Sequence, residues 1–156
     1  MADTNFYPLK VKAIKATGEA AAVLTFEVPT EHQTKFVYTQ GQYLTLKFEV
    51  NGKEERRAYS LCSSPTADPD LQVGIKRVEG GLISNYIHDN IKAGQTVDVM
   101  PPQGHFYTKL KEDQKKDYFL FGAGSGITPL FSILKTVLEV EPKSRVFLYY
   151  GNRHED

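Results

Sequence analysis

The chain has 156 residues, enough for one ordinary domain or for one domain and part of another. Nineteen basic residues balance nineteen acidic ones, which argues against nucleic acid as a partner. No apolar run reaches the ~18–20 residues of a membrane span and the first residues do not resemble a signal peptide, so we expect a cytoplasmic protein without a membrane partner. The single cysteine, Cys62, excludes an intramolecular disulfide and a four-cysteine metal site built by this chain alone.

Up to about residue 113, short runs rich in β-branched and aromatic residues alternate with turn residues. Asn51-Gly52 predicts a hairpin, because a type I′ turn needs positive φ at both central residues. Apolar residues at helical spacing over 82–91 predict one helix between the last two strands. An antiparallel barrel or sandwich follows from six predicted strands: 7–16, 21–28, 43–50, 57–60, 71–78 and 96–100.

After Asp117 the pattern changes to strand, glycine turn, helix and strand. Residues 118–121 form a continuous apolar run, typical of a strand covered on both faces. An apolar stripe over 127–140 predicts a helix with Pro129 in its first turn, and 146–150 predicts a second buried strand. A single βαβ unit is little for a parallel sheet, so we expect a second domain that is cut short.

Arg57-Ala58-Tyr59-Ser60 lies at the end of a predicted strand. A guanidinium can bind a phosphate bidentately, a phenol ring can stack on a flat heterocycle, and a serine hydroxyl can bond to a ring nitrogen. In an extended strand Tyr59 shares a face with Arg57, and Ser60 lies on the other face. An ordinary strand with a surface arginine explains the same four residues, so both interpretations stay open here.

Two glycine-rich turns each precede a predicted helix. Gly80-Gly81 leads into a helix that contains Ser84, and Gly122, Gly124 and Gly126 precede the helix with Thr128 and Pro129. The free N–H groups at a helix start suit a phosphate, and glycine allows its close approach. The second turn has the spacing G-x-G-x-G, which differs from the usual G-x-G-x-x-G dinucleotide fingerprint. Each turn alone is also compatible with ordinary helix capping.

Together and in this order, the three elements resemble the ferredoxin–NADP reductase family. Its motifs Arg-x-Tyr-Ser, Gly-x-x-Ser and Gly-x-Gly-x-Gly-x-x-Pro correspond to 57–60, 81–84 and 122–129. Arg56-Arg57, the stretch 99–106 and residues 150–153 are similar to reductases of aromatic oxygenases and of phenylacetyl-CoA epoxidase. The resemblance implies a six-stranded antiparallel Greek-key flavin-binding barrel over 1–113. It also implies the start of an NAD(P)-binding α/β domain, truncated, over 114–156.

The resemblance also implies roles for individual residues. Arg57 would bind the FAD pyrophosphate, Tyr59 would lie against the isoalloxazine, and Ser60, the catalytic position, would hydrogen-bond near flavin N5. Asn152-Arg153 would contact the adenosine end of the nicotinamide nucleotide. No metal ligand is implied. The implied cofactor-binding residues are Arg57, Ala58, Tyr59, Ser60, Lys76, Val78, Gly80, Gly81, Leu82, Ile83, Ser84, Gly122, Gly124, Gly126 and Thr128.

The implied activity is hydride transfer from NAD(P)H to FAD, followed by single-electron transfer to an iron–sulfur domain or ferredoxin-type acceptor of an oxygenase. In the family the nucleotide domain continues further, so we expect FAD binding but little or no NAD(P)H turnover from this chain. Two alternatives are a barrel scaffold that docks a partner without flavin, and an oligonucleotide- or oligosaccharide-binding barrel. The sequence leaves NADH against NADPH, the acceptor and the oligomeric state open.

Overall fold

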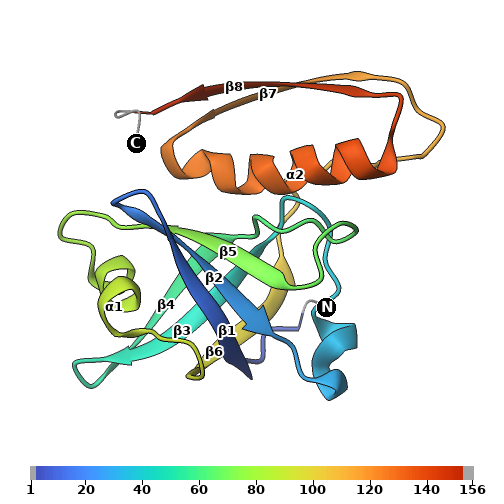
Figure 1. The fold of residues 1–156 in the computed structure, drawn as a ribbon. Coiled ribbons are helices and arrows are strands. Elements are labelled where there is room, and N and C mark those ends of the chain that lie inside the picture. Colours follow the sequence, from blue (N-terminus) through green and yellow to red (C-terminus); the bar gives the residue numbers. More distant parts are fainter. Residues whose placement is uncertain (1–2, 153–156) are drawn as a thin grey trace.

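A computed structural model describes residues 3–152 and arranges them in three layers (Figure 1). These are a barrel, the helix α2 (Ile127–Val140) beside it, and a two-stranded sheet on the far side of that helix. The barrel is one antiparallel sheet in the order β4-β3-β6-β1-β2-β5. Its strands are β1 (Tyr7–Thr17), β2 (Ala21–Glu27), β3 (Tyr43–Val50), β4 (Lys53–Ser60), β5 (Leu71–Lys76) and β6 (Thr96–Gln103). The predicted six-stranded antiparallel architecture is confirmed.

The barrel core follows from the alternation of apolar and polar residues along the strands. Leu9, Leu24 and Leu46 are fully buried, each on a different strand. Helix α1 (Leu82–Asn90) closes one end of the barrel and buries Ile83 and Ile87 in the same core. A short 3-10 helix, η1 (Thr30–Lys35), joins β2 to β3 and was not predicted.

Two turns decide where the strands begin and end. Asn51 and Gly52 have φ of 54° and 71°, as the predicted hairpin requires. The turn places Lys53 opposite Val50, so β4 begins four residues earlier than the predicted strand over 57–60. Strand β6 continues through Pro101 and Pro102, because the register with β3 shifts there and neither proline has to donate to a ladder.

The second part is one βαβ unit, as predicted. Strands β7 (Asp117–Ala123) and β8 (Arg145–Gly151) pair in parallel and are joined by the 3-10 turn η2 (Gly124–Gly126) and α2. The prediction of a strand covered on both faces is wrong, because Phe119 and Phe121 are 56% and 70% exposed. Alternation puts them on the face away from α2, where they stack on the rings of Phe147 and Tyr149.

Helix α2 contacts the barrel through polar groups. The Ser132 hydroxyl donates to the Ser63 carbonyl at 2.6 Å, and the Thr136 hydroxyl donates to the Ser64 hydroxyl at 2.9 Å. Lys135 forms an ion pair with Asp68. These contacts hold the first turn of α2 beside β5, where the candidate site lies.

Within residues 3–152, no helix is both long and apolar enough to cross a bilayer. The cytoplasmic location stays a prediction.

Candidate functional site

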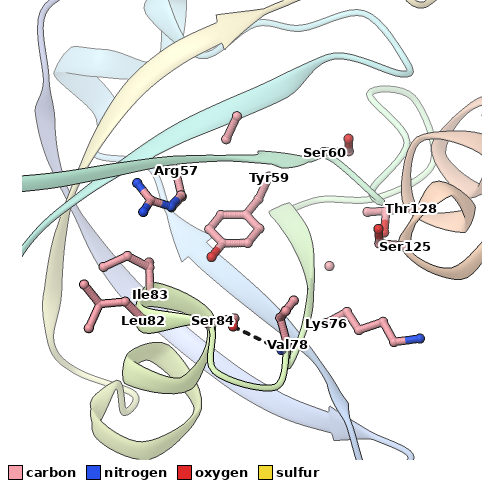
Figure 2. Close-up of a pocket in the computed structure, with 13 residues that line it drawn as sticks. Arg57, Tyr59, Ser60, Lys76, Val78, Leu82, Ile83, Ser84, Ser125 and Thr128 are labelled. Carbon is pink, nitrogen blue, oxygen red and sulfur yellow. Dashed lines mark hydrogen bonds between the residues drawn. The ribbon is translucent and has the colours of Figure 1, made fainter.

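The site lies where the two edge strands of the barrel separate. β4 pairs with β3 and β5 with β2, and the two edges meet at a bridge between Leu61 and Val73. Beside that bridge their backbone groups are available to a ligand. A cavity of about 460 Å³ opens there, within the range of small-molecule sites (Figure 2). It is lined by Arg57, Ala58, Tyr59, Ser60, Gly74, Lys76, Val78, Gly81, Leu82, Ile83, Ser84, Ser125 and Thr128.

Arg57 supplies a cation at one end of the cavity. Its Nη1 donates to the carbonyl of Arg56 at 2.7 Å and forms an ion pair with Glu55 at 3.0 Å. No residue in the described part of the chain accepts a hydrogen bond from its Nε or Nη2. That edge of the guanidinium can therefore bind a phosphate bidentately.

The start of α1 supplies hydrogen-bond donors to the same cavity. The N-cap residue Gly81 has no side chain, and the N–H groups of the first turn have no acceptor within the helix. The Ser84 hydroxyl accepts the Val78 N–H at 3.1 Å, which leaves its own proton free to donate. A Cβ at Gly81 would lie 2.7 Å from the Ser84 hydroxyl, so this close turn needs glycine.

Tyr59 lies between Arg57 and Ser60 in the middle of the cavity (Figure 2). Its ring is half-buried; burial raises the pKa of the phenol, and the nearby Arg57 opposes that shift only in part. The phenol is therefore neutral at physiological pH and offers a flat, uncharged surface. Ser60 lies at the other end of the cavity, toward Ser125 and Thr128 (Figure 2).

The first turn of α2 reaches the cavity across Gly74. A Cβ at Gly74 would lie 2.9 Å from both Oγ1 and Cγ2 of Thr128, so only glycine leaves room for this contact. Sequence reasoning missed Gly74, although a glycine inside a strand pattern is a known signal of close approach. It also left Ser125 out of the predicted set.

Four predicted glycines do not line this cavity: Gly80, Gly122, Gly124 and Gly126. Gly122 instead allows β7 to pack against α2, since a Cβ there would lie 2.6 Å from Leu130. Gly80 has φ of 68° and makes the turn before α1.

A second, larger groove of about 1010 Å³ adjoins the first. It runs between the start of β2, strand β5, the turn η2 and the end of β8, and Gly124 and Asn152 line it. Arg153, which the sequence paired with Asn152, lies outside the described residues. Cys62 also lines this groove; burial raises the pKa of its thiol to about 11, so it is no thiolate at neutral pH. The two cavities share Gly74, Lys76, Ser125 and Thr128.

The first cavity is suited to binding more than to acid–base chemistry. Its titratable side chains are Arg57, Tyr59 and Lys76, and no carboxylate is among the lining residues. One end offers a cation and helix N–H groups to an anion, and the middle offers an aromatic ring to a flat molecule. A ligand that joins a phosphate to a flat heterocycle matches this arrangement, with the phosphate at the cationic end and the heterocycle against Tyr59.

Comparison with known proteins agrees with this chemistry. Residues 8–107 match the oxidoreductase FAD-binding domain family, and residues 120–156 match the oxidoreductase NAD-binding domain family. The first match alone covers more than half of the chain. The chain belongs to the FAD-binding oxidoreductase domains of the ferredoxin–NADP reductase type.

Among curated relatives, one of the subunits of the 1,2-phenylacetyl-CoA epoxidase of Escherichia coli K12 is 40% identical over 150 residues, which are 96% of this chain and 42% of the relative. The ferredoxin reductase component of the 3-ketosteroid-9-alpha-monooxygenase of Rhodococcus rhodochrous is 43% identical over 94% of this chain and 41% of its own. The chain thus spans about two-fifths of the length of these relatives.

Solved structures share the fold. The FAD/NAD-binding domain of nitric oxide dioxygenase from Vibrio cholerae aligns with a TM-score of 0.81 at 26% identity, over 98% of this chain and 64% of that one. Phthalate dioxygenase reductase aligns with a TM-score of 0.78 at 24% identity, over 96% of this chain and 44% of that one, and shows the fold alone.

Proposed function

We propose that this chain is the FAD-binding part of an NAD(P)H-dependent reductase. The observation that carries the proposal is that the Arg57 guanidinium, the free N–H groups of α1 and the Tyr59 ring line one cavity between β4 and β5. Membership of an FAD-binding domain family supports the same ligand.

Different residues of the cavity bind the pyrophosphate and the isoalloxazine of FAD. Arg57 and the first turn of α1, with Ser84, hold the pyrophosphate, because both present donors and positive potential. Tyr59 packs on the isoalloxazine, and Ser60 hydrogen-bonds near the reacting ring nitrogen as the catalytic residue. When bound, the flavin supplies hydride-accepting and one-electron chemistry. The protein residues bind and orient it.

The second groove is our proposed site for the nicotinamide nucleotide. It borders the first cavity at Ser125 and Thr128, and the NAD-binding domain match over 120–156 includes both residues. We retain the division into a FAD-binding part, 1–113, and an NAD(P)-binding part, 114–156. The curated relatives are more than twice as long as this chain, so reduction of bound flavin by NAD(P)H is proposed for the full-length protein.

For the full-length protein, we propose electron transfer to an iron–sulfur acceptor that serves an oxygenase. One relative is named as a subunit of an epoxidase, and another is named as the ferredoxin reductase component of a monooxygenase. The similarity to the epoxidase component makes phenylacetate degradation our proposed pathway.

Arg57→Gln tests the pyrophosphate assignment, with Arg56→Gln as the matched control. Arg56 is the residue before Arg57 on β4, forms an ion pair with Glu54 and does not line the cavity. Loss of a charge-assisted hydrogen bond at a half-exposed site should weaken FAD binding about ten- to thirtyfold for Arg57→Gln. Arg56→Gln should stay within about twofold. Titration of FAD fluorescence measures both, and equal losses in the two variants would contradict the assignment.

A further inference from the structure

Arg57 has a carboxylate neighbour for which flavin binding has no evident need. Glu55 lies two residues before Arg57 on β4, and its Oε2 lies 3.0 Å from the Arg57 Nη1. The Glu55 side chain is 26% exposed and that of Arg57 is 50% exposed. Glu55 does not line the cavity, so its carboxylate contacts the guanidinium from just outside the ligand space.

The strand register puts this pair on the inner side of the barrel. Glu55 pairs with Phe48 and Arg57 with Leu46, and both partners are buried in the core. Directly opposed residues point to the same face of a sheet, so Glu55, Arg57 and Tyr59 share the face that borders the cavity. Glu54 and Arg56 alternate with this pair along β4, form an ion pair of their own and point to the opposite face.

We propose that Glu55 is an internal counter-ion that limits the affinity of this site for the phosphate groups of a flavin nucleotide. This inference rests on the proposed flavin-binding function. Glu55 neutralises part of the Arg57 charge and adds a negative charge beside the position of the pyrophosphate. The Arg56 carbonyl also accepts a hydrogen bond from Nη1 at 2.7 Å, so Glu55 is not the only group that holds the guanidinium.

Glu55 also stabilises the protein in the absence of a ligand. Without a ligand, the Arg57 cation lines the same cavity as the N-terminal turn of α1, where the helix dipole is positive. Glu55 offsets that unfavourable arrangement in the empty protein. The same residue therefore favours the empty site and opposes an anionic ligand.

Glu55→Gln tests the proposal, because glutamine keeps the size and a hydrogen-bond acceptor but removes the charge. Dissociation constants for riboflavin, FMN and FAD are measured by quenching of flavin fluorescence. Glu55→Gln should lower those of FMN and FAD about two- to fivefold, the worth of a partly exposed ion pair, and leave riboflavin unchanged because it has no phosphate. The gain should shrink between about 0.02 M and 0.5 M salt as screening increases.

Glu54→Gln is the matched control, since it makes the same change of net charge on the other face of β4. It should alter no dissociation constant by more than about 1.5-fold. Unchanged or weaker FAD binding in Glu55→Gln, or an equal gain for riboflavin, would overturn the proposal. Glu55→Thr, which suits a strand, repeats the test if Glu55→Gln does not fold. If the wild-type chain binds none of the three flavins, the proposed function itself fails.

Discussion

At the scale of single residues, the contact between Gly74 and Thr128 connects the barrel to the βαβ unit. Thr128 is buried in the first turn of α2, and its Oγ1 and Cγ2 occupy the space that a side chain at Gly74 would need. The contact positions the turn that lines both cavities.

Gly74→Ala should therefore destabilise the chain. A methyl group 2.9 Å from two atoms of a short, branched side chain cannot be accommodated without a shift, and such overpacking costs about 1–3 kcal/mol. Urea denaturation measures the loss in the free energy of unfolding. Thr128→Ala in the same chain should recover most of it, because both crowded atoms are removed. If the losses in unfolding free energy of Gly74→Ala and Thr128→Ala simply add in the double variant, the two residues do not interact and the prediction is wrong.

At the scale of elements, a buried carboxylate ties the linker before β7 to the end of α2. Glu141 is fully buried and accepts hydrogen bonds from the Lys111 N–H at 3.1 Å, the Tyr118 hydroxyl at 2.9 Å and the Ser144 hydroxyl at 2.7 Å. Burial alone would raise its pKa, but these hydrogen bonds outweigh burial and hold the pKa below the usual 4.5. Burial and the adjacent carboxylate raise the pKa of Tyr118 to about 12.

These shifts predict how stability depends on pH. The contribution of Glu141 is present above pH 4.5, the pKa of an unfolded glutamate, and is lost as pH falls through the lower pKa of the folded state. Tyr118 favours the folded state below pH 10 and loses this contribution as pH rises toward 12. Glu141→Gln should lower the free energy of unfolding at pH 7 by about 1–3 kcal/mol. It should also reduce the dependence of that free energy on pH, both below pH 4.5 and above pH 10. Urea titrations at several pH values check this, and a variant whose stability depends on pH as the wild type does would contradict it.

Elements with a strong local signal could be predicted from the sequence. The apolar stripe gave α2 its observed bounds, 127–140, and Asn51-Gly52 gave the hairpin turn. The 3-10 helix η1 was missed, because a helix of six residues with three residues per turn is too short to show a clear apolar periodicity. The continuation of β6 through Pro101-Pro102 was missed as well, because a bulge depends on the partner strand and not on local propensity.

At the scale of the whole molecule, the gathering of three motifs around one cavity could not be derived from their spacing. Residues 57–60, 81–84 and 125–128 meet because β4 and β5 are the two edges of one curled sheet and the first turn of α2 contacts β5 at Gly74. The family resemblance predicted this arrangement, whereas each motif alone was compatible with an ordinary turn or strand. Burial of β7 on both faces was predicted wrongly for a related reason, since it depends on what covers the face of the sheet that points away from α2.

The proposed function depends on binding of FAD in the cavity between β4 and β5. The most direct test is an absorbance spectrum of the purified chain after incubation with FAD and removal of free ligand by gel filtration. We predict flavin bands that remain with the protein and are shifted from those of free FAD, because in the proposed site the flavin ring would lie against Tyr59. A spectrum without flavin bands at any FAD concentration, from a folded protein, would contradict the account and leave Arg57, Tyr59 and Ser60 as parts of an ordinary strand.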